Sequence, residues 1–323
     1  MELAAQDNSA FSLADSFKAL GDPMRFEIVR IMQRDSFGVL ELCSLFDVRQ
    51  PAMSHHLKVL VEAGFLCSRR EGNSLFYRRV LPEPSASTQS LQQLFQLIDR
   101  EPVATSLYQK LRSLQEQREQ RSRDFFLRNA ERFRDQQDLI AGHGEYGSAI
   151  VQMVDSLELP QSSWLEVGCG EGELLGELAG NFERVVALDV SAELLQRARQ
   201  RLAGVTHLDW WCKELDSSAC AGEFGLVTCS MVLHHLASPA ELISEMATAL
   251  APGGYLLLCD LCSHDQEWSR TSCGDLWLGF EREQLLDFAG YEGLGLHSEQ
   301  FLALRNGFRV QLLIFKNQQE ANT

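Results

Sequence analysis

Glycine and acidic residues in the second half of this 323-residue chain have the types and spacing of a nucleotide-cofactor site. The segment WLEVGCGEG at 164–172 runs from apolar residues into alternating glycines, and a second apolar run, RVVALDVS at 184–191, contains Asp189. Glycines let a backbone approach a ligand closely, and an acidic residue after the next strand accepts hydrogen bonds from a ribose. This spacing predicts a βαβ unit that binds a nucleotide cofactor, for which a nicotinamide dinucleotide is the usual ligand.

Polar residues in the first half of the chain have the types that bind nucleic acid. Between residues 50 and 63, apolar residues recur at helical spacing and predict an inward-facing stripe of Met53, Leu57, Leu60 and Val61. The side chains off this stripe are donor-rich groups of the kind that reach base edges and phosphates in the major groove. These DNA-binding candidates are Arg49, Gln50, Ser54, His55 and Lys58.

A basic hairpin is predicted directly after this helix. The segment FLCSRREGNSLFYRRV at 65–80 holds two alternating stretches around Gly72 and Asn73, which is typical of two strands joined by a tight turn. Its basic side chains would contact the DNA backbone, and such contacts depend on salt but not on base sequence. They are Arg69, Arg70, Arg78 and Arg79.

Four helices are predicted between residues 11 and 64. Asp22 and Pro23 suit the N-cap and the first turn of a helix over about 23–34. A shorter apolar stripe precedes the helix at 50–63 and consists of Leu40, Leu42, Leu45 and Phe46. Two short helices with a turn between them, followed by a basic hairpin, predict a winged helix-turn-helix, mainly helical with a β-wing.

The charge of the chain is distributed unevenly. The net charge is −1 over residues 1–83, +1 over residues 84–141 and −16 over residues 142–323. Residues 49–79 nevertheless carry a local charge of +4. Because binding to nucleic acid depends on local charge, the acidic total does not exclude a DNA partner.

Composition divides the chain into three parts. Proline and small polar residues at 81–90 predict a domain edge, and residues 103–141 lack Pro and Gly and favour a long polar helix. We expect a DNA-binding domain at 1–83, a linker and helical spacer at 84–141, and an α/β domain at 142–323. The sequence lacks a membrane-length apolar run and a signal peptide, so we expect no membrane partner, reduced cysteines and a cytoplasmic location.

The N-terminal segments ALGDPMRFEIVRIM at 19–32 and QPAMSHHLKVLVEAGFLCSRREGNSLFYRRV at 50–80 resemble the ArsR/SmtB family of dimeric winged-helix repressors. The resemblance implies a homodimer that binds a palindromic site on double-stranded DNA. Many members sense metals through a Cys-x-Cys pair, where this chain has Cys43 and Leu45. A single thiolate cannot build such a site, so we expect Cys43 in the core and no metal.

The C-terminal segments WLEVGCGEG, FGLVTCSMVLHHL at 224–236 and LAPGGYLLLCDL at 250–261 resemble the class I S-adenosylmethionine-dependent methyltransferases. The resemblance covers about 140–316 and implies a Rossmann-like fold that binds S-adenosylmethionine or S-adenosylhomocysteine rather than a nicotinamide cofactor. In this family the first acidic residue holds the ligand's amino group and the second holds the ribose. The implied binding residues are Glu166, Gly168, Cys169, Gly170, Asp189, Val190, Trp211, Cys212, Ser230 and Met231.

Some positions depart from the family pattern. Trp210, Trp211 or Cys212 stands where the family usually has an acidic residue for the adenine amine, and Gly225 replaces a common aspartate. No catalytic base can be identified, and we expect the adjacent His234 and His235 to be packed or to line the ligand. Polar residues near the family's acceptor pocket either shape it or cap loops; they are His264, Asp265, Glu267 and Asp275.

The fusion of an ArsR/SmtB-type head to a methyltransferase-like body resembles a group of bacterial regulators, some of which sense S-adenosylhomocysteine. The resemblance implies a transcriptional regulator, a repressor of methionine-cycle genes, with S-adenosylhomocysteine or S-adenosylmethionine as small-molecule effector. The alternative is an active small-molecule methyltransferase with a DNA-binding domain for autoregulation. A third interpretation, a metal- or arsenite-responsive repressor, lacks the Cys-x-Cys pair. Ligand binding and turnover use the same glycines, so the sequence leaves the first two open.

Overall fold

The computed structural model describes residues 13–71, 74–80, 89–129 and 139–318. The chain forms two compact units, which divide between Glu116 and Gln117. This division falls inside the predicted spacer at 84–141, and each unit has a hydrophobic core of its own. Residues 81–88, most of the predicted domain edge, lie outside the described residues.

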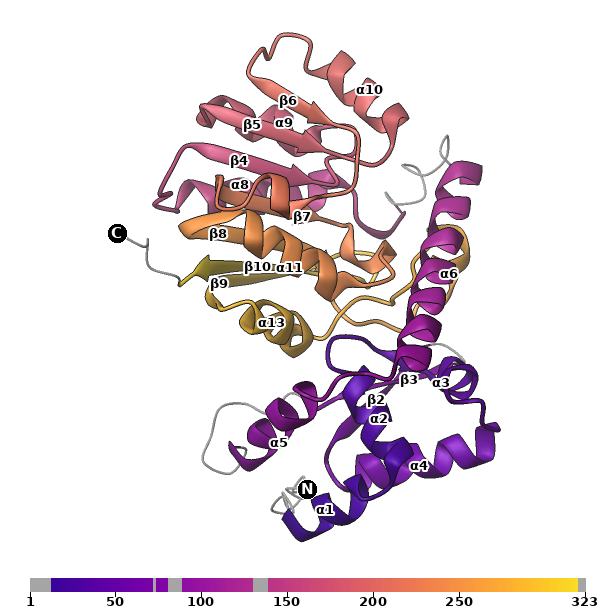
Figure 1. Ribbon diagram of the computed structural model, residues 1–323. Coiled ribbons are helices and arrows are strands. Elements are labelled where there is room, and N and C mark those ends of the chain that lie inside the picture. Colours follow the sequence, from indigo (N-terminus) through magenta and orange to yellow (C-terminus); the bar gives the residue numbers. More distant parts are fainter. Residues whose placement is uncertain (1–12, 72–73, 81–88, 130–138, 319–323) are drawn as a thin grey trace, which may run out of the picture. The chain divides into compact units, whose positions relative to one another are not determined.

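The first unit is a winged helix-turn-helix, as predicted (Figure 1). Its helices are α1 (Leu13–Leu20), α2 (Pro23–Ile31), α3 (Val39–Phe46), α4 (Gln50–Glu62), α5 (Gln89–Asp99) and the first half of α6 (Thr105–Asn129). Its strands are β1 (Phe37–Gly38), β2 (Leu66–Glu71) and β3 (Ser74–Arg79). They pair antiparallel in the order β1-β3-β2, and β2 and β3 form the predicted basic hairpin.

Local sequence signals fix the start and the buried face of these helices. The Asp22 side chain accepts a hydrogen bond from the Arg25 N–H, so α2 begins at the predicted cap. The inner side of α4 is fully buried and consists of Met53, Leu57 and Leu60.

Two residues that we predicted on apolar stripes are exposed instead. Val61 is 37% exposed and Leu40 is 72% exposed. At 100° per residue, Val61 lies at the margin of the α4 stripe, and Leu40 lies on the opposite side of α3 from Leu42 and Leu45. Both predictions were wrong, because the angle of a residue around the helix, and not its apolar type, decides whether it faces the core.

Arg79 corrects the predicted set of DNA-backbone contacts. Its Nε donates to the Val29 carbonyl at 2.7 Å, and its Nη2 pairs with Asp99 Oδ1 at 2.6 Å. Its guanidinium also lies over the Phe95 ring, 4.7 Å from the centroid. Alternation along β3 turns this side chain inward with Tyr77, so it joins α2, β3 and α5 inside the unit.

Helix α6 occupies much of the segment predicted as a long polar helix, of which residues 130–138 lie outside the described part. Its first half belongs to the first unit, where Lys110 Nζ donates to the Leu45 carbonyl at 3.0 Å. Its second half belongs to the second unit, where Ser122 Oγ donates to the His235 carbonyl at 3.0 Å. The helix therefore adds Leu107 to the core of the first unit and makes a polar contact in the second.

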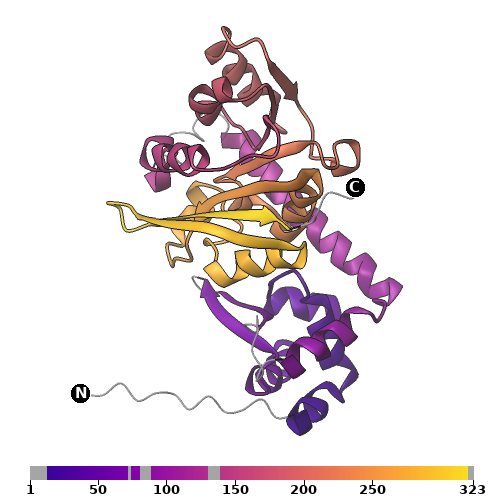
Figure 2. The same ribbon diagram turned by 90° about the vertical axis from the view of Figure 1, so that its left-hand side faces the viewer.

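The second unit is an α/β domain built on a 7-stranded sheet in the order β6-β5-β4-β7-β8-β10-β9. The strands are β4 (Ser163–Val167), β5 (Arg184–Leu188), β6 (Leu208–Trp211), β7 (Phe224–Ser230), β8 (Leu250–Leu261), β9 (Leu294–Ala303) and β10 (Arg309–Asn317). Pairs from β6 to β8 are parallel, and β10 runs antiparallel to both β8 and β9. Figure 2 shows β9 and β10 as a long hairpin.

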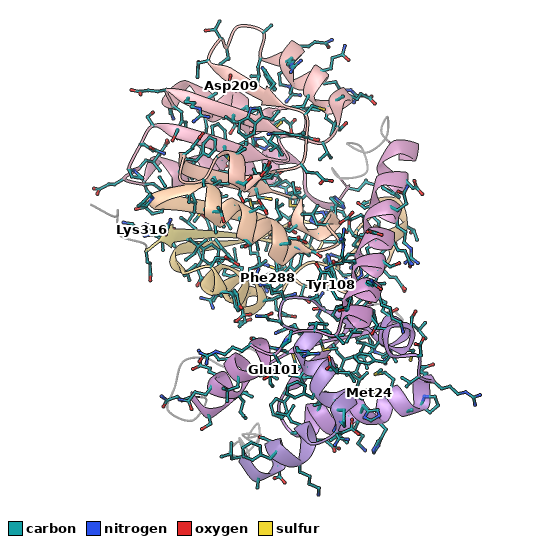
Figure 3. The ribbon with its side chains drawn as sticks, in the orientation of Figure 1. Met24, Glu101, Tyr108, Asp209, Phe288 and Lys316 are labelled. Atoms are coloured by element: carbon teal, nitrogen blue, oxygen red, sulfur yellow. The ribbon has the colours of Figure 1, made fainter. Side chains whose placement is uncertain are left out.

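Helices cover both faces of this sheet (Figure 1). The helices on one face are α8 (His143–Asp155), α9 (Glu173–Leu178) and α10 (Ala192–Arg201), and those on the other are α11 (Pro239–Ala249) and α13 (Arg282–Tyr291). Phe288 on α13 is buried, whereas Asp209 on the edge strand β6 is exposed (Figure 3). The fold class is thus the predicted Rossmann-like one. Within the described part of the chain, no helix combines the length and the apolar character needed to cross a membrane.

The strand order reverses at β4. Strands β5 and β6 follow β4 on one side, and β7 and β8 continue on the other. In open α/β sheets, ligands bind beyond the carboxyl ends of the strands at such a reversal. The topology therefore points to the loops after β4, β5 and β7 as the candidate site.

We predict that Arg79→Ala destabilises the first unit by about 3 kcal/mol or more, because it leaves Asp99 without its buried partner. Hydrogen exchange of the α2 and β3 amide groups in the full chain measures this free energy of local unfolding. Arg70→Ala is the matched control, since Arg70 is an exposed arginine of the same hairpin, and should change stability by less than about 0.5 kcal/mol. Equal effects of the two variants would contradict the structural role of Arg79.

Candidate functional site

The glycine loop follows β4 at the reversal of strand order. Gly168 and Gly170 have φ values of 73° and 53°, in the left-handed region that favours glycine. A Cβ on Gly168 would come within 2.4 Å of Val232 Cγ2, whereas a Cβ on Gly170 would meet no described atom within 4 Å. Packing therefore requires Gly168, while Gly170 borders open space that a ligand can occupy.

Asp189 ties this loop to the end of β5. Its Oδ2 accepts a hydrogen bond from the Gly170 N–H at 2.9 Å, and its Oδ1 accepts one from the Ser191 N–H at 2.8 Å. Burial raises the pKa of the Asp189 carboxyl, although these backbone hydrogen bonds oppose the shift. Each carboxylate oxygen keeps a further lone pair with which it can accept from a ligand hydroxyl.

Glu166 lies buried on β4, just before the glycines. Burial, and then the charge of Asp189, raise the pKa of Glu166 well above its usual range. Its Oε2 is buried and makes no hydrogen bond with any described residue. A buried acceptor of this kind needs a partner, and a ligand ammonium group would satisfy both its hydrogen bond and its charge.

The ends of β5 and β6 supply the next predicted residues. Val190 and Cys212 are exposed, and Cys212 Sγ lies 3.9 Å from the Val190 carbonyl oxygen. Trp211 is half-buried, with Lys213 Nζ 4.5 Å from its ring centroid. Trp210 packs against the core of the unit, and the Trp211 ring lies edge-on to Phe224.

The end of β7 carries backbone strain. Met231 has a φ of 56°, which is costly for a residue with a side chain, and its N–H donates to the Cys259 carbonyl at 2.7 Å. Ser230 Oγ is buried and makes no hydrogen bond with a described residue. All the predicted ligand residues thus stand at the carboxyl ends of β4 to β7, although their binding roles stay predictions.

A buried His–Asp cluster lies beyond β7 and was not predicted as a unit. His234 Nδ1 and Asp260 Oδ1 are 2.7 Å apart, and His234 Nε2 and Asp275 Oδ1 are 3.8 Å apart. His235 Nδ1 lies 3.6 Å from the same Asp275 oxygen. The sequence signal that could have revealed this cluster is Asp260, an acidic residue inside the apolar run LLLCDL of a buried strand.

Charge interactions inside this cluster oppose the effect of burial at His234 and Asp275 and add to it at His235. Burial disfavours the charged form of His234, but the carboxylates of Asp260 and Asp275 outweigh it and raise its pKa to about 8. Burial and the charge of His234 lower the pKa of His235 well below its usual range. Burial raises the pKa of the Asp275 carboxyl, against the attraction of His234.

The predicted DNA-binding side chains divide between exposed and partly covered positions. Those of α4 and its start are exposed: Arg49, Gln50, Ser54, His55 and Lys58. On the wing, Arg70 is exposed, while Arg69 and Arg78 are half-buried. Cys43 packs against the core of this unit, and burial raises the pKa of its thiol.

Two family models match the chain. A helix-turn-helix domain model matches residues 20–69, and a methyltransferase domain model matches residues 114–296. The first match covers α2 to α4 and part of the wing, and the second covers the strands from β4 to β8 with the glycine loop and the His–Asp cluster.

Two relatives are similar to part of this chain. The chain is 26% identical over 132 residues to nodulation protein S of Rhizobium tropici, which is 40% of this chain and 56% of that protein. It is 35% identical over 108 residues to the ubiquinone biosynthesis O-methyltransferase of Xanthomonas euvesicatoria pv. vesicatoria, which is 32% of this chain and 45% of that enzyme. The chain thus spans about half the length of these relatives.

Among solved structures, the N-methyltransferase NodS from Bradyrhizobium japonicum in complex with S-adenosyl-L-homocysteine is similar at a TM-score of 0.45 and 22% identity. The match covers 54% of this chain and 87% of NodS. The methyltransferase domain model, by contrast, matches more than half of the chain. With its glycine loop, its mostly parallel sheet and a helix-turn-helix domain at its N-terminal end, the chain belongs to the methyltransferase-domain family.

Proposed function

We propose that this protein is a DNA-binding transcriptional regulator whose methyltransferase-family unit binds S-adenosylhomocysteine or S-adenosylmethionine as effector. The observation that carries the proposal is the combination in one chain of a winged helix with an exposed polar α4 face and a glycine loop with open space at Gly170. The regulated genes would then be those of the methionine cycle, with S-adenosylhomocysteine as the preferred effector.

The α4 face supports the DNA-binding part of this proposal. Its inner residues are fully buried, so the helix cannot rotate without exposing them, and Gln50, Ser54 and Lys58 stay on the outside. Amide, hydroxyl and ammonium groups on one helix face are suited to the base edges and phosphates of a major groove. Arg70 adds a cation from the wing, which suits the phosphate backbone.

Exposed apolar residues on the first unit support a homodimer. Leu13 and Phe17 on α1 are 48% and 60% exposed, and Leu97 on α5 is 58% exposed. Side chains of this size on a winged-helix unit favour association through α1 and α5. A two-fold dimer would bind two half-sites of a palindromic operator.

The glycine loop supports the effector part. The open space at Gly170, the oriented carboxylate of Asp189 and the hydrogen-bond capacity of Glu166 Oε2 would accommodate the ribose and amino groups of the ligand. The half-buried Trp211 would offer an aromatic ring for stacking with adenine.

A second candidate function is methyl transfer to a small acceptor. The similarity to an enzyme named ubiquinone biosynthesis O-methyltransferase favours it, as do the polar groups beyond β7, beside the position expected for the methyl donor. Incubating the protein with labelled S-adenosylmethionine and a cell extract tests it. Transfer of label by the wild type but not by Asp189→Ala would show that the protein is a methyltransferase. Absence of transfer by both proteins would leave the transcriptional regulator as the proposed function.

We predict that Arg70→Ala weakens binding to all DNA sequences alike and lowers the slope of log affinity against log salt by about one, because it removes a phosphate contact. Gln50→Ala should instead reduce discrimination between operator and mutant sites by about 1–3 kcal/mol. Fluorescence anisotropy on a duplex selected from a random pool measures both. Arg100→Ala, an exposed arginine outside the wing and α4, is the control and should leave the slope unchanged. An unchanged slope in Arg70→Ala would show that the wing does not touch the backbone.

We predict that S-adenosylhomocysteine changes operator affinity, and that operator DNA changes ligand affinity by the same factor, because coupling between two sites is reciprocal. Asp189→Ala should abolish the response while ligand-free operator binding stays intact, since Asp189 belongs to the other unit. Asp209→Ala is the matched control, because Asp209 is exposed on the neighbouring strand β6. If neither ligand shifts wild-type affinity by more than about twofold, or about 0.4 kcal/mol, the effector proposal is wrong.

We predict that affinity for S-adenosylhomocysteine falls as the pH drops through the raised pKa of Glu166. A cationic amino group prefers the ionised carboxylate, so protonation of Glu166 weakens binding by up to about tenfold per pH unit below that pKa. Calorimetric titration over a pH series measures the effect, and Glu166→Gln should flatten it. An identical pH profile in that variant would assign the dependence to another group.

A further inference from the structure

We propose that His234, His235 and Asp275 form a binding site for a divalent transition-metal ion of the Zn²⁺ type. The site lies beyond the carboxyl ends of β7 and β8. This site is not the Cys-x-Cys metal site of the ArsR/SmtB family, whose second cysteine is Leu45 in this chain. The proposal differs from our expectation from the sequence, which was that the protein binds no metal. It does not depend on whether the protein acts as a regulator or as an enzyme.

The separations of the candidate ligand atoms fit one ion. His234 Nε2, His235 Nδ1 and one carboxylate oxygen of Asp275 all lie within 4.8 Å of one another. The two His–Asp separations are 3.8 and 3.6 Å. Ligand atoms at tetrahedral Zn²⁺ stand about 3.4 Å apart, given bonds of about 2.0–2.1 Å. Movements of a few tenths of an ångström would therefore bring the two His–Asp separations to this value.

Asp260 orients His234 in the way that a second carboxylate does at known metal sites. His234 donates its Nδ1 proton to Asp260 Oδ1 over 2.7 Å, so its Nε2 is the nitrogen directed toward Asp275. Asp260 is itself held, because it accepts hydrogen bonds from the backbone N–H groups of Leu233 and Leu261. A carboxylate–histidine pair of this kind fixes the ring and strengthens it as a ligand.

The backbone around the cluster is also fixed. The N–H groups of Leu276 and Trp277 donate to the His234 carbonyl at 2.9 and 3.1 Å, which ties the Asp275 loop to the histidine segment. Gly274 has a φ of 79°, and a Cβ there would stand 2.3 Å from the Phe125 ring. The loop that carries Asp275 is therefore held against α6, and the three ligand atoms are positioned in advance.

The composition of the cluster indicates the class of ion. Two imidazoles and one carboxylate suit borderline ions such as Zn²⁺ or Fe²⁺ rather than Mg²⁺ or Ca²⁺, which prefer oxygen ligands. Both oxygens of Asp275 are buried, and Ser269 is the side chain of the described residues placed to donate a hydrogen bond to them. A dication with two neutral imidazoles would balance the charges of Asp260 and Asp275. Three protein ligands would leave a coordination position for water or another oxygen ligand.

The test uses the untagged full-length chain and Zn²⁺ as the probe. After chelation, reloading and gel filtration, elemental analysis should find about one Zn²⁺ per chain in the wild type, because each chain holds one such ligand set. Asp275→Asn and His235→Gln should lose it, and Asp260→Asn should weaken it by about 10–100-fold. His297→Gln, an exposed histidine outside the cluster, is the matched control and should keep it.

A second measurement covers the case in which a buried variant fails to fold. Wild-type protein loaded with Co²⁺ should show visible absorption bands of a four- or five-coordinate site, which Zn²⁺ then displaces. Wild-type protein that retains no Zn²⁺ and shows no such bands would overturn the proposal, as would a folded Asp275→Asn variant that keeps its Zn²⁺. Because these readouts need neither DNA nor methyl transfer, their failure is distinct from failure of the proposed function.

Discussion

The reversal of strand order at β4 is the constraint on which the candidate chemistry of the second unit depends. Parallel strands end on the same side, so the loops after β4, β5 and β7 meet although they are far apart in the sequence. The left-handed glycines then turn the chain sharply after β4, and Asp189 fixes that turn by accepting the Gly170 N–H. The turn also leaves open space beside Gly170.

Periodicity and turn chemistry were sufficient to predict most of the fold. The cap at Asp22, the glycine loop and the α4 stripe apart from Val61 each depend on residues close together in sequence, and all lie where predicted. Arg79 could not be predicted in the same way, because its partners Val29 and Asp99 are distant in sequence. An arginine on a basic hairpin gives no local sign that its own side chain points inward.

The same limit applies to the His–Asp cluster. His234 and His235 were visible as an adjacent pair in an apolar stretch, and packed or ligand-lining roles were the natural prediction. Their proximity to Asp260 and Asp275 follows from the pairing of β7 with β8 and from a loop anchored on the His234 carbonyl. Neither the register of parallel strands nor such a loop contact is specified by nearby residues, so a short-range pattern cannot reveal the group.

Helix α6 makes side-chain contacts in each of the two units. It is one continuous helix whose Lys110 binds the end of α3 in the first unit and whose Ser122 binds the His235 carbonyl in the second. Arg118 also lies over the Trp277 ring, next to the Asp275 loop. The Lys110 contact belongs to the first unit, and the Ser122 and Arg118 contacts belong to the second, so each unit holds its own part of α6. An effector would change DNA affinity only if it bound two conformations of the chain unequally.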